Sequence, residues 1–359
     1  MALAAVNPIA IAASYPLRMS MTRRDAMTVL AAGSAALFTG ASPADDRPPE
    51  ADFLIWKPAG DRAWCAVGSG GNSTLLKGDG AAILIDCKNA PYGPCLRRES
   101  LRRVPSLAMV VNTHHHGDHT GGNHAFSADI EIVAHDKCTD RVLGQMNRYI
   151  SQMKEAAKQL AEGDGPVIRQ VREEALSLYK RVEKIKETDF VPRTTFSATR
   201  EIDLPGIKAT MHHLGPGHTD NDLVIHAHDR NVLVVGDLLF HKMHPFVDAA
   251  SGADINGWQS ALRKCLDLCD ARTVVVGGHG DVTDAAALKT QIAYFDKLRE
   301  FVGKAMKDGK TRADIGAMRM PGYGTYGLDQ LASSGLLAMH DHLKAQGRAG
   351  AETPTPDAR

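Results

Sequence analysis

The sequence predicts an α/β fold in which two sheets form a sandwich with helices on the outside. Two groups of short apolar runs, each bounded by turn residues, are each followed by segments with helical spacing. Each run is four to eight residues long, about the length of a strand buried inside a fold. Imidazole and carboxylate side chains follow the ends of several runs, and side chains at strand ends converge at one edge of a sheet.

The first group of strands begins after the Gly78-Asp79-Gly80 turn. We expect strands at 81–86 and 106–112, where the chain is rich in Ile, Leu and Val, and a third strand at 130–134.

The spacing of apolar residues changes from a strand-like to a helical period near Thr139, which predicts a helical hairpin inserted at 139–187. Apolar residues recur at spacings of three and four up to Leu160, a Gly- and Pro-containing stretch at 163–166 breaks the pattern, and the same spacing resumes from Ile168 to Ile185. We expect the apolar stripe to pack on the core and the charged residues to face solvent.

The second group of strands is predicted at 207–214, 223–227, 231–235 and 273–276. Helices are expected at 255–268 and 285–306, where apolar residues return to helical spacing. The last residues, 347–359, are rich in Ala, Pro and Thr, and we expect them to be disordered.

The N-terminal residues 1–44 resemble a twin-arginine export signal. Arg23 and Arg24 precede an uncharged run from Ala26 to Gly40, and Ala44 offers a small residue for cleavage. The alternative is a disordered tail with a chance Arg-Arg pair. The apolar run is too short to span a bilayer, so no stable membrane insertion is expected. The sequence thus predicts an exported, periplasmic protein with one catalytic domain at 45–346.

Composition narrows the classes of partner. The 42 basic and 42 acidic residues balance, so bulk charge gives no case for binding nucleic acid, and a small-molecule substrate is expected. The six cysteines lack C-x-x-C spacing, which argues against a thiolate metal site. Cys265 and Cys269 are expected to be packed thiols on one helix, whereas the state of Cys87 and Cys95 stays open. Composition does not fix the oligomeric state.

The segment 113–123, Thr-His-His-His-Gly-Asp-His-Thr-Gly-Gly-Asn, directly follows the predicted strand at 106–112. His114 and His116 are two residues apart in an extended segment and can bind one metal ion, and Asp118 and His119 can bind a second. These are ligand types that zinc prefers. The alternative is a His-rich surface loop.

Three further ligand candidates also follow predicted strands. His218 lies in Gly-Pro-Gly-His after the strand that ends at Leu214. Asp237 lies in Gly-Asp-Leu-Leu-Phe, and His279 lies in Gly-Gly-His-Gly. A single histidine beside glycines is more often structural, but the three motifs together predict a second set of ligands.

In order along the chain, these segments resemble the five metal motifs of the metallo-β-lactamase superfamily, from about Asp86 to about His279. The resemblance implies an αββα sandwich that holds two divalent ions, with zinc expected and iron as an alternative. It implies that the first ion is bound by His114, His116 and His218. It implies that the second is bound by Asp118, His119 and His279. Asp237 would bridge the two ions, and His115 would either hydrogen-bond beside the ligands or face away.

The bridging carboxylate makes the motifs most similar to those of hydroxyacylglutathione hydrolases. The resemblance therefore implies a hydrolase that uses a hydroxide shared by two metals to attack an ester, thioester or lactone, with Asp118 as the catalytic residue. His241 and His244 are expected either to line the substrate pocket or to lie in an incidental surface loop. The alternative functions are β-lactam hydrolysis, an iron-dependent redox reaction of sulfur or oxygen, and a non-catalytic accessory role.

Overall fold

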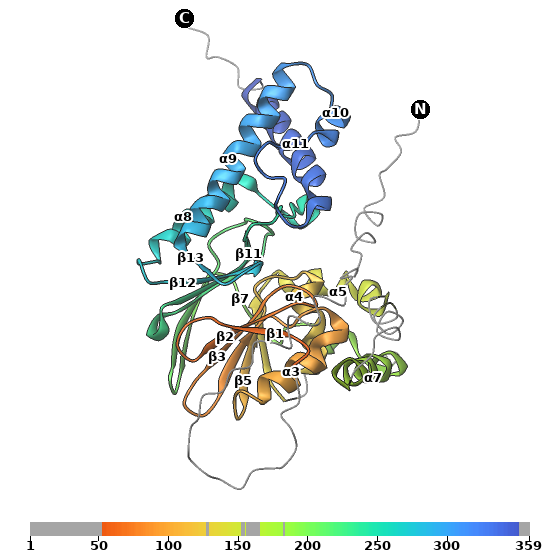
Figure 1. The fold of residues 1–359 in the computed structure, drawn as a ribbon, viewed down its shortest axis with the longest axis vertical. Helices are drawn as coiled ribbons and strands as arrows, with labels where there is room; N and C mark the ends of the chain where they lie inside the picture. Colours follow the sequence, from red (N-terminus) through yellow and green to blue (C-terminus); the bar gives the residue numbers. More distant parts are fainter. Residues whose placement is uncertain (1–51, 127–128, 152–154, 156–165, 182–183, 352–359) are drawn as a thin grey trace, which may run out of the picture. The chain divides into compact units, whose positions relative to one another are not determined.

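The computed structural model describes residues 52–126, 129–151, 155, 166–181 and 184–351 (Figure 1). The predicted export signal at 1–44 lies outside these residues. Within the described part of the chain, no helix has the length and apolar character needed to cross a membrane.

The first sheet has seven strands in chain order. They are β1 (Ile55–Pro58), β2 (Ala63–Val67), β3 (Ser73–Lys77), β4 (Ala82–Ile85), β5 (Leu107–Val111), β6 (Glu131–His135) and β7 (Thr194–Phe196). Strands β1 to β4 pair antiparallel, whereas β4 to β7 run parallel. The three strands predicted for this half are β4, β5 and β6.

The second sheet has six strands in the order β13-β12-β11-β10-β9-β8. They are β8 (Thr199–Leu204), β9 (Ile207–His212), β10 (Val224–Ala227), β11 (Val232–Phe240), β12 (Val274–His279) and β13 (Thr283–Asp284). Strands β8 to β11 pair antiparallel and β11 pairs parallel with β12, so the ends of β11 and β12 meet at one edge.

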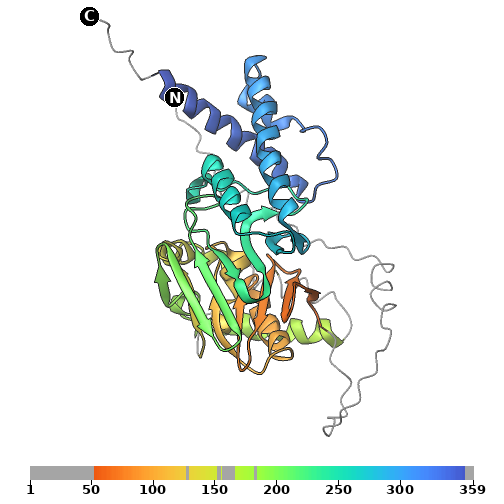
Figure 2. The same ribbon diagram turned by 90° about the vertical axis from the view of Figure 1, so that its left-hand side faces the viewer.

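The two sheets pack face to face, and helices cover both outer faces (Figures 1 and 2). Apolar side chains from both sheets, including Ile83, Val111 and Ile225, form the cluster between them. Helix α3 (Gly93–Leu101) packs on the outer face of the first sheet. Helices α8 (Ile255–Asp267) and α9 (Ala285–Lys307) pack on the second, whereas α11 (Ala332–Ala351) packs against α9, and α10 (Arg312–Ala317) lies against α11. The predicted αββα sandwich is therefore confirmed.

Strand β11 is longer than the predicted strand at 231–235. It runs to Phe240, and its pairing with β12 is irregular on both sides of Gly236. Gly236 has a φ of 52° and lies against the Thr113 side chain, which would meet a Cβ atom at 2.7 Å. A residue without a side chain is needed here, because both the backbone conformation and the close contact exclude one. Asp237 thus lies on a bent strand and not after its end.

The inserted hairpin differs from its prediction in two places. Its first helix is divided, because α5 (Cys138–Leu143) ends at a turn at 144–145 and helical structure resumes at 146. Glycine at 144 disfavours a continuous helix. The second helix, α7 (Pro166–Lys180), ends before Ile185, since Arg181 N–H bonds the carbonyl of Leu178 in a tighter turn. The predicted break at 163–165 lies outside the described residues.

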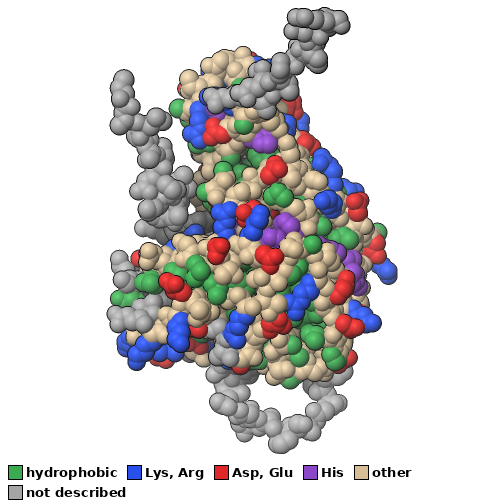
Figure 3. Space-filling model, turned by 180° about the vertical axis from the view of Figure 1, so that it is seen from behind, with side chains coloured by type: hydrophobic (Ala, Val, Ile, Leu, Met, Phe, Trp, Pro, Cys, Tyr) green, Lys and Arg blue, Asp and Glu red, His purple; other side chains and the backbone are tan. Residues whose placement is uncertain are grey.

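The C-terminal prediction is wrong over 347–351, because α11 continues to Ala351; residues 352–359 are not described. All six cysteines are free thiols, as expected for Cys265 and Cys269. Basic and acidic side chains are interspersed over most of the face in Figure 3.

Candidate metal centre

The seven predicted ligands gather around the ends of β5 and β12, the bend in β11 and the loop between β9 and β10. They form two clusters, and within each cluster the ligand atoms lie within 4.8 Å of one another. The first cluster contains His114, His116, His218 and Asp237, and the second contains Asp118, His119 and His279.

Three imidazole nitrogens converge in the first cluster. His116 Nδ1 lies 3.1 Å from His114 Nε2 and 2.9 Å from His218 Nε2. Burial lowers the pKa of His114 well below its usual range and lowers the pKa of His218 to about 3. Both rings are therefore neutral at neutral pH and present lone pairs to the same point, as metal ligation requires.

The second cluster combines one carboxylate with two imidazoles. The Oδ2 atom of Asp118 lies 3.3 Å from His279 Nε2 and 3.6 Å from His119 Nε2. Burial opposes a charge on His119 and His279, but nearby carboxylates, Asp237 foremost, outweigh it and raise both pKa values, that of His279 to about 9. Without a metal, these two rings hold protons that a metal ion would displace.

The carboxylate of Asp237 lies between the two clusters. Its Oδ2 atom is 3.4 Å from the Nε2 atoms of both His218 and His279, and its Oδ1 atom is 3.1 Å from His119 Nε2. One carboxylate therefore faces ligand atoms of both clusters.

The donor set fits divalent metal ions. His119 Nε2 and Asp237 Oδ1 are buried, and although they lie 3.1 Å apart, neither makes a hydrogen bond of good geometry. Buried polar atoms without good hydrogen bonds are costly, and a metal ion would satisfy both. A glycine packs against each of these two atoms. A Cβ atom at Gly71 would overlap His119 Nε2, and a Cβ atom at Gly278 would overlap Asp237 Oδ1. Imidazole and carboxylate together suit zinc and similar borderline ions.

The family model of the metallo-beta-lactamase superfamily matches residues 66–279, which span all seven side chains. This chain belongs to the metallo-beta-lactamase superfamily. It is accordingly an enzyme of the metal-dependent hydrolase class.

Individual relatives are distant. The probable metallo-hydrolase YqjP of Bacillus subtilis (strain 168) is 25% identical over 241 residues, which are 63% of this chain and 71% of that protein. An uncharacterized protein of Mycobacterium tuberculosis (strain ATCC 25618 / H37Rv) is 26% identical over 57% of this chain and 83% of its own length. The solved metallo-beta-lactamase from Pontibacter korlensis shares the fold, with a TM-score of 0.50 and 16% identity, over 68% of this chain and 99% of its own.

Beside the ligand candidates, one carboxylate without a predicted role supports both clusters. Asp86, at the end of β4, accepts hydrogen bonds from the backbone N–H and the hydroxyl of Thr113, both at 2.7 Å. It also lies 2.8 Å from His119 Nδ1, and the Thr113 hydroxyl lies 3.0 Å from His114 Nδ1. The signal was available, because Asp86 follows a buried strand just as the ligand motifs do.

A second support comes from the loop between β11 and α8. We call residues 246–251 the capping loop. The carbonyl of Phe246 lies 2.9 Å from His218 Nδ1, and Asp248 Oδ2 lies 2.8 Å from His116 Nε2. The Ser251 hydroxyl lies 3.0 Å from His115 Nε2. His115 therefore does not face away but is hydrogen-bonded beside the ligands, as one of the two expectations held.

The inserted segment also supports the His-rich motif. The Gln145 amide donates to the carbonyl of His115 at 2.8 Å, and the hydroxyls of Tyr149 and Thr120 lie 2.8 Å apart. Tyr149 is fully buried and packs beside Gly117. The insertion therefore contacts the metal-binding segment directly.

The two predicted pocket residues lie outside both clusters. The Nδ1 atom of His244 is 2.9 Å from the hydroxyl of Tyr294, and His244 lines a cavity of about 230 Å³ together with Tyr323 and Arg319. The Nδ1 atom of His241 lies 3.2 Å from the carbonyl of Asp281. A role for either residue in binding substrate stays a prediction.

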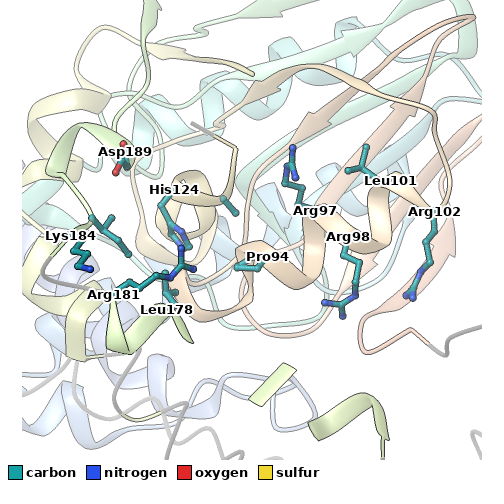
Figure 4. Close-up of a pocket in the computed structure, with 12 residues that line it drawn as sticks. Pro94, Arg97, Arg98, Leu101, Arg102, His124, Leu178, Arg181, Lys184 and Asp189 are labelled. Atoms are coloured by element: carbon teal, nitrogen blue, oxygen red, sulfur yellow. The ribbon is translucent and has the colours of Figure 1, made fainter. Parts of the chain in front are cut away.

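A larger cavity, of about 810 Å³, lies between α3 and the end of the insertion (Figure 4). Arg97, Arg98 and Arg102 line one side, and Arg181 and Lys184 line the other. Arg97 and Arg98 already form ion pairs with Asp129 and Glu174. None of the seven ligand candidates lines this cavity, so it is separate from the metal centre.

Proposed function

We propose that this protein is a hydrolase with two divalent metal ions, zinc in the first place, that cleaves a small ester, thioester or lactone. The observation that carries the proposal is the position of Asp237, whose two carboxylate oxygens face both clusters of ligand atoms. A shared carboxylate holds two ions close together, as a nucleophile shared between them requires.

The chain's own residues would bind and orient the reactants. His114, His116 and His218 would hold one ion. Asp118, His119 and His279 would hold the other, and Asp237 both. When bound, such ions lower the pKa of water towards neutrality and polarise an acyl oxygen.

Asp118 is the proposed catalytic group. Its side chain is 24% exposed, compared with 18% for His279 and 4% for Asp237, so it is the more accessible of these ligands to a water molecule. Burial opposes the charge on Asp118, but His119 and His279 together outweigh burial and hold its pKa below the usual range. Asp118 is therefore ionised at neutral pH, and its carboxylate can orient a water molecule and accept its proton.

The charge of Asp237 indicates which leaving group the site favours. Asp237 would add a negative charge shared by both sites, and an ion held in the second site would then be less able to stabilise a departing amide nitrogen. Alkoxide and thiolate leaving groups need less help. The motif resemblance to hydroxyacylglutathione hydrolases supports the same choice.

The test is a substrate panel assayed on zinc-loaded protein, comprising acyl thioesters, γ-lactones, nitrocefin and a carbapenem. We expect kcat/KM for the best thioester or lactone to exceed that for any β-lactam by at least about tenfold, or about 1.4 kcal/mol in transition-state free energy. The His116→Ala variant is the control for contaminating activity. Faster turnover of nitrocefin or the carbapenem would overturn the assignment of substrate class. Iron in the purified protein, with no hydrolysis of any substrate, would favour the redox alternative.

A further inference from the structure

The capping loop contacts two histidines of the first cluster, His116 and His218, on the side away from the cluster, and it also contacts the neighbouring His115. Its three contacts use the carbonyl of Phe246, the carboxylate of Asp248 and the hydroxyl of Ser251. Of these three groups, only Asp248 carries a charge, and only Asp248 contacts His116. The loop lies more than 120 residues along the chain from His116, so the contact is a product of the fold.

The two nitrogens of His116 have different roles. Its Nδ1 atom lies among the ligand nitrogens, 3.1 Å from His114 Nε2 and 2.9 Å from His218 Nε2. Its Nε2 atom points the other way and lies 2.8 Å from Asp248 Oδ2. If Nδ1 presents its lone pair to a metal, Nε2 carries the proton and donates it to the carboxylate. A hydrogen bond of this kind fixes the tautomer and the orientation of a metal-binding ring and makes it a stronger ligand.

We infer that Asp248 is a positioning residue that sets the affinity of the first metal site through His116. The inference rests on the proposed function, because it requires that the first cluster binds a metal. Side-chain exposure is only 10% for His116 and 15% for Asp248, so the contact is largely shielded from water. Charged hydrogen bonds shielded in this way are stronger than those at the surface.

Asp248 is itself held in place from two directions. Its Oδ1 atom accepts from the backbone N–H of Ser251, which closes the short turn at the end of the loop. From the insertion, Arg141 of α5 donates to the carbonyl of Ala250 at 3.0 Å and to Asp220 at 2.8 Å. The Asp220 N–H bonds the carbonyl of Ser251. The insertion therefore fixes the loop from which Asp248 reaches His116.

A direct role for Asp248 as a metal ligand fits less well. The atoms of His115, His116 and Asp248 lie close enough to form a third group. However, His115 already has partners at both nitrogens, Asn221 at Nδ1 and Ser251 at Nε2. Asp248 therefore acts as a hydrogen-bond acceptor for His116.

The experiment compares Asp248→Asn and Asp248→Ala with the parent protein by titrating metal-free protein with Co²⁺ and then Zn²⁺. Absorption of Co²⁺ reports the ligand field of each site, and competition with a chelator gives the affinities. The control is Asp281→Asn. It also removes a carboxylate close to a ligand, two residues from His279, but Asp281 is 64% exposed and paired with Lys57.

We expect Asp248→Ala to weaken the first site by about 10- to 100-fold and to leave the second site within about threefold of the parent. Asp248→Asn keeps an acceptor oxygen but loses the charge, so its effect should be smaller. Arg141→Ala should weaken the same site by a smaller factor than Asp248→Ala. The control variant should bind both metals like the parent protein.

Unchanged first-site affinity in Asp248→Ala would overturn the inference. Equal weakening of both sites would also overturn the inference, because it would show that the substitution destabilises the whole protein. A lower melting temperature of the metal-free variant would identify that case. Loss of a third metal equivalent, with the first site intact, would show that Asp248 is a ligand. If the parent protein bound no metal, the proposed function itself would fail, which is a distinct result.

Discussion

The Nδ1 atom of His119 lies 2.8 Å from a carboxylate oxygen of Asp86, and the hydroxyl of Thr113 donates to the same oxygen. This contact leaves the Nε2 atom of His119 directed at Asp237, without a hydrogen bond of good geometry. Asp86 thus orients one ring of the second cluster and, through Thr113, one ring of the first.

We expect Asp86→Asn to weaken metal binding by about 10- to 100-fold, the usual effect of losing a carboxylate that orients a ligand. The amide can donate where the carboxylate only accepts, so it conflicts with the donors of Thr113 and His119. Metal content after dialysis against a chelator measures the effect. Asp79→Asn, which alters an acidic residue that is 64% exposed, is the control. Full metal content in Asp86→Asn would show that the contact is incidental.

Two glycines give a steric test of the site. A methyl group at Gly71 would overlap the ring of His119, and one at Gly278 would overlap Asp237 Oδ1. Gly80 is the matched control, because nothing lies within 4 Å of a Cβ atom there. We expect Gly71→Ala and Gly278→Ala to lose most bound metal and more than about 100-fold in kcat/KM, whereas Gly80→Ala should match the parent.

Circular dichroism separates displacement of a ligand from unfolding in these glycine variants. A Gly278→Ala protein that folds and retains two metals would show that Asp237 can move without loss of the site, and its proposed bridging role would then be wrong.

Residues close together in sequence were the most predictable part of this site. His114, His116, Asp118 and His119 fall within six positions, so their chemistry was visible before any fold was known. His218, Asp237 and His279 were found because each follows an apolar run. Asp248 had no such signal, since it lies in a loop without apolar periodicity and meets His116 only in the folded chain.

The elements missed from the sequence lack strong periodicity. Strands β1 to β3 contain few β-branched residues, and β8 buries only Ile202. Helix α3 begins with Gly-Pro and buries an acidic residue, Glu99, which accepts hydrogen bonds from Phe53 N–H and Trp56 Nε1. A carboxylate is buried only where hydrogen-bond donors from distant parts of the chain reach it, and the local sequence pattern around Glu99 does not reveal those donors.

Export remains a prediction that the described residues do not address. If the paired arginines direct the folded protein through the twin-arginine route, changing Arg23 and Arg24 together to Lys should hold the full-length protein in the cytoplasm. Fractionation followed by detection of precursor and mature forms measures this. Normal processing of the double variant would mean that the N-terminal segment is not such a signal.

The last prediction concerns Lys88, whose ammonium group is fully buried. It donates to the carbonyls of Ala66 at 2.5 Å and Gly71 at 2.6 Å, and burial lowers its pKa to about 8. Gly71 is the residue that packs on His119, so Lys88 also helps to fix the backbone behind a ligand.

A lysine with a lowered pKa binds its proton less tightly in the folded chain than in the unfolded chain, where the pKa is about 10.5. Below pH 8 the folded protein bears the full cost of burying a charge, and above pH 10.5 the cost is absent. The free energy of unfolding should therefore gain a contribution that rises with pH between these limits, by at most about 3.4 kcal/mol.

Lys88→Met should abolish this contribution. The stability of the variant at pH 7 does not test the prediction, because removing a buried charge is favourable while leaving two carbonyls without a donor costs about 1–3 kcal/mol each. The test is how the free energy of unfolding changes with pH. Urea unfolding of metal-free protein at intervals from pH 7.5 to 10.5 should give a difference between parent and variant that grows steadily with pH. Lys264→Met, which removes a surface lysine that also donates to a carbonyl, should run parallel to the parent. If Lys88→Met ran parallel as well, the ammonium group would be charged throughout this range, and burial would not lower its pKa in the folded protein.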